Sequence, residues 1–318
     1  MIGFDIGGTK CAVCVGNETA NGMKITDKRI IPTDHSVSPY EMIDRMWALA
    51  LEMGGGDTVG ISCGGPLDSV RGVILSPPNL PGWDDVAIVN YLREKYGVKA
   101  YLQNDANACA VAEWKFGAGK GTRNMVFLTF GTGMGAGLIL NGQLYAGASD
   151  MAGEIGHVRM ADYGPVGYGK KGSFEGFCSG SGIAQIGQAV ARERIQCGKA
   201  VSFCAGLSEL DAVTAKSIAQ CAEAGHADAL EVYEICGNML GRGLAILIDV
   251  LNPECIVLGS VFQRSGHLLR SSMEKVLEQE CLPHAYKACR IVPAELKENI
   301  GDYAALAVGM IGENEHAV

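Results

Sequence analysis

Two glycine-rich turns have the composition of phosphate-binding loops. Residues 5–10 read DIGGTK and residues 131–137 read GTGMGAG. Glycine lets the backbone approach a phosphate closely, so that N–H groups can donate to its oxygens. In the first turn a threonine hydroxyl and a lysine ammonium add a donor and a charge, and Asp5 could hold a hydrated Mg²⁺. The expected phosphate ligands are Asp5, Gly7, Gly8, Thr9, Lys10, Gly131, Thr132, Gly133 and Gly135.

The sequence of these turns excludes two other nucleotide-binding motifs, but it leaves a purely structural role open for the first turn. Neither turn has the G-x-G-x-x-G pattern of dinucleotide sites, and Lys120 precedes a glycine instead of the Ser or Thr of a Walker loop. The first turn alone could be an ordinary tight hairpin. Two such turns that face each other across a cleft could clamp the polyphosphate of one nucleotide. Gly259 and Ser260, after a buried strand, suit an adenine ring, although a plain strand-to-helix turn explains them equally well.

Asp105 is the best candidate for a catalytic base. It follows Asn104 at the end of an expected strand, where ligands of α/β proteins bind. A sugar hydroxyl must lose a proton when it attacks a γ-phosphate, and a positioned carboxylate can accept that proton. The two residues could equally serve as a helix cap.

Other polar residues suit sugar hydroxyls. Asn79, in a loop rich in turn formers, offers both a donor and an acceptor for a vicinal diol. Glu154, His157 and Glu175 supply two carboxylates and an imidazole. Their spacing is irregular for a metal site, and ordinary surface roles explain these three residues about as well.

The elements that must position these residues repeat along the chain. Met1–Ile6 and Lys10–Val15 are expected strands around the first turn, and Met125–Phe130 and Ala136–Leu140 are expected strands around the second. This internal repeat of strand, glycine turn and strand is typical of a duplicated, actin-like α/β fold. The glycine-rich stretch 117–121 reads as a hinge. We therefore expect an N-terminal α/β domain of residues 1–118 plus 302–318 and a larger C-terminal α/β domain of residues 119–301.

Helical spacing and capping signals mark the remaining elements. The expected helices are Pro39–Met53, Asp84–Tyr96, Ala106–Phe116, 180–196, 208–223, 226–251 and 300–311.

Composition narrows the class of protein. A net charge of −9 and a pI of about 5.2 argue against general nucleic-acid binding. No signal peptide or membrane-length apolar run is recognisable, and the 12 cysteines lack a framework of paired spacings. These features are typical of a cytoplasmic enzyme with reduced thiols and no membrane partner.

Six motifs in order resemble the ROK family of sugar kinases and repressors. They are DIGGTK at 5–10, GGPLD at 64–68, PPNLPGW at 77–83, NDANA at 104–108, FGTGMGAGLI at 130–139 and GEIGH at 153–157. The resemblance extends to GDYAALAVGM at 301–310. It implies the actin-like ATPase (RNase H-like) fold, with two domains and a central cleft, and a homodimer.

The resemblance also implies an activity and its residues. ATP with Mg²⁺ would phosphorylate a hexose or N-acetylhexosamine, with O6 as the favoured hydroxyl and Asp105 as the general base. Sugar ligands would be Gly65, Asn79, Asn104, Asp105, Glu154, His157 and Glu175. Repressors of the family carry a helix-turn-helix domain before the first loop. In this chain the first loop begins at Asp5, and this early start favours a kinase over a repressor. The alternative is a non-catalytic sugar-binding or regulatory protein on the same scaffold.

One departure from the family concerns zinc. Members usually carry three cysteines after the GEIGH motif, which bind a structural zinc together with its histidine. Val166, Tyr168 and Ser173 stand at the cysteine positions here, and these side chains do not make a convincing zinc site. We therefore expect no zinc, and packing by Tyr163, Pro165, Tyr168 and Phe174 is one candidate for what replaces it.

Overall fold

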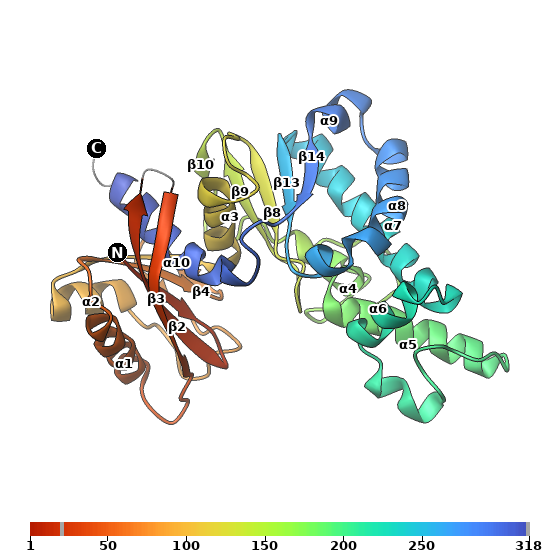
Figure 1. The fold of residues 1–318 in the computed structure, drawn as a ribbon, viewed down its shortest axis with the longest axis horizontal. Helices are drawn as coiled ribbons and strands as arrows, with labels where there is room; N and C mark the ends of the chain where they lie inside the picture. The colour runs from red at the N-terminus through yellow and green to blue at the C-terminus, as the bar shows by residue number, and fades with distance from the viewer. Residues whose placement is uncertain (20–21, 316–318) are drawn as a thin grey trace. The chain divides into compact units, whose positions relative to one another are not determined.

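The computed structural model describes residues 1–19 and 22–315 as two compact units (Figure 1). The first unit consists of Met1–Arg123, Gly137–Ala152 and the described part of Glu295–Val318, and the second of Asn124–Ala136 and Gly153–Ala294. The first unit thus includes residues 137–152, which the predicted boundaries assign to the other domain. Domain boundaries at 118 and 302 stay a prediction.

The first unit is built on a five-stranded sheet. Its strand order is β3-β2-β1-β4-β7, in which β1, β2 and β3 are antiparallel neighbours whereas β1, β4 and β7 run parallel. The bounds are Ile2–Ile6 (β1), Lys10–Thr19 (β2), Gly22–Pro32 (β3), Thr58–Cys63 (β4) and Lys99–Asn104 (β7). Short strands Leu67–Asp68 (β5) and Val73–Ile74 (β6) form a separate antiparallel pair. Ala136–Leu140 (β9) and Gln143–Leu144 (β10) are also antiparallel neighbours.

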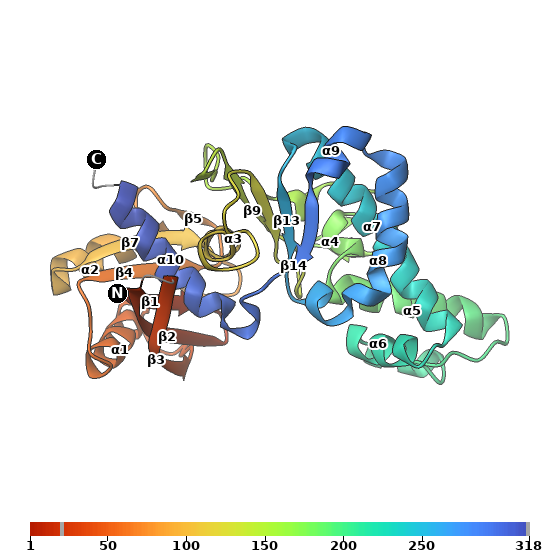
Figure 2. The same ribbon diagram turned by 45° about the horizontal axis from the view of Figure 1, so that its top comes forward.

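Helices cover both faces of this sheet (Figures 1 and 2). Phe4 and its neighbours on one face form a core with α1 (Pro39–Glu52) and α2 (Ile88–Tyr96). On the other face lies α10 (Ile300–Glu315), which also packs along α3 (Asp105–Phe116). The contact is close, since a Cβ added at Gly60 would lie 1.9 Å from the backbone oxygen of Ala305. Alternate strand residues face opposite sides, so the apolar run of each strand fills two cores.

A buried carboxylate secures the end of α3. Glu113 is 0% exposed and accepts hydrogen bonds from the N–H groups of Ala118 (2.8 Å), Glu295 (3.2 Å) and Leu296 (2.9 Å). These three bonds tie together chain segments far apart in the sequence, and they satisfy the charge that burial would otherwise penalise.

The second unit repeats the parallel part of the first. Its parallel strands lie in the order β8-β13-β14, with bounds Met125–Leu128, Cys255–Leu258 and Arg290–Pro293. Its helices are Phe174–Phe177 (α4), Gly180–Gln196 (α5), Ala215–Glu223 (α6), Ala227–Leu251 (α7), Val261–Glu280 (α8) and Pro283–Ala288 (α9). A hairpin joins Val166–Gly167 (β11) to Lys170–Lys171 (β12). The mixed α/β class expected from the sequence is confirmed.

Two expected helices are wrong in their bounds. The segment 84–96 becomes helical only at Ile88, because Val86 forms a β-bridge with Ile74. The segment 208–223 divides into a 3₁₀ turn, Leu207–Ala212, and α6, because Thr214 and Ser217 form a capping box that starts a new helix.

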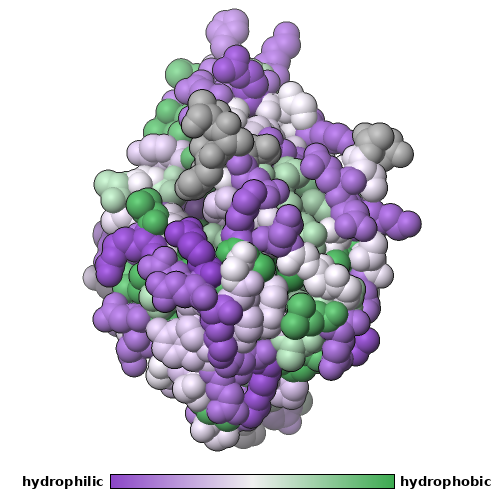
Figure 3. Space-filling view, turned by 90° about the vertical axis from the view of Figure 1, so that its left-hand side faces the viewer, coloured by the Kyte–Doolittle hydropathy of each residue, from purple (hydrophilic) through white to green (hydrophobic). Residues whose placement is uncertain are grey.

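None of the helices that the structure describes combines the length and apolar character of a membrane-spanning segment. On the face drawn in Figure 3, hydrophilic side chains are interspersed with small apolar groups.

Candidate active site

The first glycine turn, between β1 and β2, has its carbonyl oxygens held by the protein. Gly7 O accepts from Thr33 Oγ1 at 2.6 Å, Gly8 O bonds to His35 Nε2 at 2.9 Å, and Thr9 O accepts from Thr33 N at 3.0 Å. The N–H groups of Gly8 and Thr9 donate to no described protein group. A turn that keeps its carbonyls occupied and leaves adjacent N–H groups free is suited to bind an anion.

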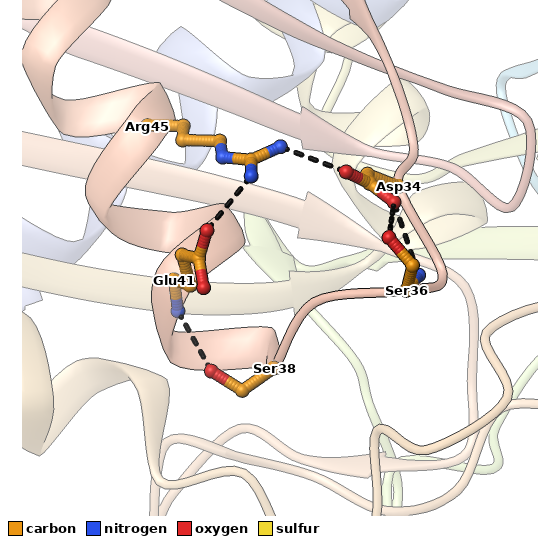
Figure 4. A network of polar contacts seen from close by, with 5 residues as sticks. All are labelled: Asp34, Ser36, Ser38, Glu41 and Arg45. Atoms are coloured by element: carbon orange, nitrogen blue, oxygen red, sulfur yellow. Dashed lines mark hydrogen bonds and ion pairs between the residues drawn. The ribbon is translucent and has the colours of Figure 1, made fainter.

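The connection that supplies these donors is itself braced (Figure 4). Asp34 accepts from Ser36 Oγ (2.6 Å) and Arg45 (2.9 Å), and Arg45 also bonds to Glu41 (2.7 Å) on α1. Ser38 caps the same helix. Because a carbonyl only accepts, Nε2 of His35 must carry the proton. Sequence reasoning assigned His35 no role, since its partner becomes visible only in the folded chain.

The second glycine turn has the same property through different partners. Gly131 O accepts from Gly180 N (2.8 Å), Thr132 O from Ser181 Oγ (3.1 Å), and Gly133 O from Gly131 N (2.9 Å). The N–H groups of Thr132 and Gly133 donate to no protein group within residues 1–19 and 22–315. Both turns therefore present N–H donors without a described protein acceptor, and their role as phosphate loops stays a prediction.

The predicted adenine turn lies beside the second loop. A Cβ added at Gly131 would lie 3.8 Å from Ser260 Oγ, and that hydroxyl accepts from Arg264 at 3.2 Å. Ser260 has a φ of 44°, in a region that favours glycine. Ser260 N also donates to Gln263 at 3.1 Å, which helps to hold this conformation at the start of α8.

In the first unit, the predicted sugar ligands lie next to the first loop. A Cβ at Gly8 would come within 2.2 Å of Asn79 O, so only glycine allows this approach. A Cβ at Gly65 would lie 3.2 Å from Asn104 Nδ2. Asn104 also caps α3, where its side chain accepts from Ala106 N at 3.0 Å. Both suggested roles of Asn104, cap and ligand, are compatible.

Two carboxylates of the first unit influence each other. The Asp105 side chain reaches solvent on one side, yet surrounding protein displaces enough water to raise its pKa above the usual 3.8. Burial, followed by the charges of Asp105 and Asp302, raises the pKa of Asp5 to about 6, although Lys28 and Lys10 act in the opposite direction. Carboxylate oxygens suit a hydrated Mg²⁺, and Asp5 stays the predicted metal residue.

In the second unit, Glu154 and His157 are exposed on the turn 153–157. Glu175, on α4, lies against this turn, since a Cβ at Gly156 would be 3.4 Å from the Glu175 Cβ. Its Oε2 accepts from Met134 N at 3.0 Å. Sequence reasoning placed Glu175 among the sugar ligands and did not foresee its bond to the phosphate loop.

The segment 166–177, for which the sequence predicts no zinc, is organised by a hairpin and a serine. Ser173 is fully buried, accepts from Gly176 N at 3.1 Å and donates to Gly167 O at 3.5 Å. No cluster of three or more His, Cys, Asp or Glu suited to a metal occurs among the described residues. The expected packing by tyrosines is wrong, because Tyr163 is 85% and Tyr168 78% exposed, whereas Phe174 is buried.

Comparisons with known proteins agree over nearly the whole chain. The ROK family model matches residues 1–309. A glucokinase of Thermotoga maritima is 30% identical over 314 residues, covering 97% of this chain and 96% of its own. A xylose repressor of Caldicellulosiruptor bescii is 26% identical, covering 81% of this chain and 64% of its own.

Solved structures give the same result. A ROK family glucokinase from Streptomyces griseus, in complex with glucose and AMPPNP, has a TM-score of 0.73 and 26% identity, with 98% of both chains covered. This likeness confirms the duplicated actin-like architecture. From the residues matched and the fold that they form, this chain belongs to the ROK family.

Proposed function

We propose that this protein is an ATP-dependent sugar kinase and that Asp105 is its general base. The observation that carries the proposal is the position of Asp105 at the start of α3, directly after the carboxyl end of β7, in the same unit as a turn whose free N–H groups suit a phosphate. Glucokinases among the relatives support this activity.

The residues would divide the reaction as follows. The N–H groups of both turns, with Lys10, bind the phosphates, and the Gly259–Ser260 turn receives the adenine. Asp105 takes the proton of the acceptor hydroxyl, whose oxygen forms a bond to the γ-phosphorus while the bond to ADP breaks. A raised pKa makes Asp105 a stronger proton acceptor near neutral pH. Mg²⁺, held by Asp5 through water, would neutralise phosphate charge.

Sugar hydroxyls would be bound by two groups of residues. In the first unit these are the backbone of Gly65 and the side chains of Asn79 and Asn104. In the second unit they are Glu154, His157 and Glu175. We further propose a hexose or N-acetylhexosamine as substrate, O6 as the acceptor, a homodimer, and a cytoplasmic location, all by analogy with the family. Carbon NMR of the product identifies the phosphorylated hydroxyl, and light scattering gives the oligomeric state.

A sugar panel coupled to ADP release tests the activity. Glucose, N-acetylglucosamine, N-acetylmannosamine, allose and fructose are the first acceptors to assay. Turnover of at least one sugar is expected. Sugar binding without ADP release from any of them would instead favour the regulatory alternative, which the similarity to a xylose repressor keeps open.

Asp105→Asn tests the base. The amide keeps the oxygen that accepts from Ala106 N, so the helix start is preserved. Loss of the proton acceptor should lower kcat by about 10²–10⁴-fold. Affinity for ADP with Mg²⁺, measured by calorimetry, should change little. Turnover like that of the wild type would remove Asp105 from this role.

A further inference from the structure

Glu175 contacts the phosphate loop as well as the segment that carries the expected sugar ligands. Its Oε2 accepts from Met134 N at 3.0 Å, and a Cβ built at Gly133 would lie 2.7 Å from the same oxygen. Glu175 is therefore packed directly against the residue whose N–H is free for a phosphate. No side chain larger than hydrogen fits between them without movement.

The sugar-side segment presses on the same residues. A Cβ at Gly156 would lie 2.1 Å from Met134 O and 3.4 Å from the Glu175 Cβ. A Cβ at Gly167, on the hairpin, would lie 2.9 Å from the Glu175 Cβ. The turn 153–157, the phosphate loop and the hairpin thus meet around the Glu175 side chain, with Gly156 and Gly167 at its Cβ and Gly133 at its carboxylate. Movement of this side chain cannot leave the loop unaffected.

One oxygen of this carboxylate is still available. Only Oε2 is hydrogen-bonded within the described part of the chain, and Oε1 can accept from a hydroxyl. A sugar hydroxyl that donates to Oε1 would fix the carboxylate and so also the loop that Oε2 holds. A fixed loop favours nucleotide binding, and linkage requires that nucleotide then favours sugar equally.

We propose that Glu175 is a positioning residue that couples the acceptor-alcohol site to the phosphate loop, so that sugar and nucleotide each strengthen binding of the other. The inference rests on the proposed kinase function. It differs from a simple sugar-ligand role in one respect, because it requires that Glu175 affects nucleotide affinity even when no sugar is present.

Calorimetry of ADP with Mg²⁺ in the absence of sugar is the decisive measurement. Glu175→Ala should weaken this binding about five- to tenfold, because Met134 N loses its acceptor. Glu175→Gln keeps an acceptor oxygen and should stay within about threefold of the wild type. Wild-type affinity in Glu175→Ala would overturn the proposal. If the wild-type protein bound no ADP at all, the kinase function itself would fail instead.

The coupling is measured by repeating the titration with the panel sugar of highest turnover at saturation. Wild-type affinity for ADP should rise, and in Glu175→Ala the rise should disappear. Equal rises in the two proteins, or no rise in the wild type, would contradict the coupling.

A double-mutant cycle tests the contact itself. Gly133 has no left-handed φ, so Gly133→Ala is restricted only by the carboxylate of Glu175. This variant alone should lower ADP affinity, whereas adding it to Glu175→Ala should cost little more. Additive losses would show that the two residues act independently. Because Gly133→Ala retains Glu175, it also provides a test should Glu175→Ala fail to fold.

Discussion

The charged carboxylate of Asp5 should lower the stability of the folded protein at neutral pH, and Asp5→Asn should restore that stability. Burial and the neighbouring charges of Asp105 and Asp302 raise the pKa of Asp5 to about 6, from 3.8. Between these two values the folded state holds a proton that the unfolded state has released. Stability therefore falls as pH rises from about 4 to about 6, and remains lower above that range. A neutral amide of the same shape avoids the penalty.

The size of the effect follows from the two pKa values. The difference corresponds to an upper limit of about 3 kcal/mol. Asp5 is partly accessible to solvent, so a gain of about 1–2 kcal/mol at pH 8 is the reasonable expectation. For a unit of this size, that gain raises the unfolding temperature by roughly 2–8 °C. At pH 4 most of the difference should vanish, because Asp5 is then protonated in the folded state.

Tryptophan fluorescence is the assay, because all three tryptophans, Trp47, Trp83 and Trp114, belong to the unit that contains Asp5. Thermal unfolding is followed at pH 8 and pH 4 without nucleotide or Mg²⁺. Asp85→Asn, at an exposed position, is the control and should change neither curve. If Asp5→Asn gave no gain at pH 8, or the same gain at both pH values, the electrostatic reasoning would be refuted.

Three further predictions concern side chains that hold the site. His35→Ala should weaken binding of ADP with Mg²⁺ about three- to tenfold, because Gly8 O loses its donor. Calorimetry measures this affinity, and an unchanged value would mean that the imidazole does not support the loop. Glu113→Gln should lower the free energy of unfolding by about 1.5–3 kcal/mol, since an amide NH₂ would face backbone donors. Urea titrations followed by tryptophan fluorescence measure this, and a change below about 0.5 kcal/mol would contradict the prediction. Purified protein should contain no stoichiometric zinc by mass spectrometry, and Ser173→Ala should destabilise the second unit by about 1–2 kcal/mol in calorimetric melts. Bound zinc or an unaffected melt would show that Ser173 does not organise the segment.

The strands around both glycine turns were predictable because local signals determine them. Continuous apolar runs beside clustered glycines have few alternatives, and β1 and β9 appear within one residue of their expected bounds. The start of α6 was also present in the sequence, as Thr214 three residues before Ser217, but the apolar periodicity obscured it. Helix α8 was not predicted; it contains a non-helical residue at Ser265, and its apolar face is interrupted by polar residues.

The contacts of the candidate site residues could not be predicted from the sequence. Asn79 was proposed from its loop composition, but its contact with Gly8 depends on how the chain folds back. His35 and Glu113 have no recognisable neighbours in the sequence, because their partners are backbone groups that only the tertiary structure brings close. The bond from Met134 to Glu175 spans 41 residues and is equally invisible to local patterns.

The two glycine turns share one property, occupied carbonyls beside N–H groups without a described acceptor, but they owe it to unrelated supports. The first is held by Thr33 and His35 from the connection after β3, and the second by Gly180 and Ser181 at the start of α5. An ancestral duplication would have copied the strand–turn–strand unit, while each copy later acquired its own braces. Because the supports share no residue, the surroundings of one turn can change during evolution without a change at the other turn.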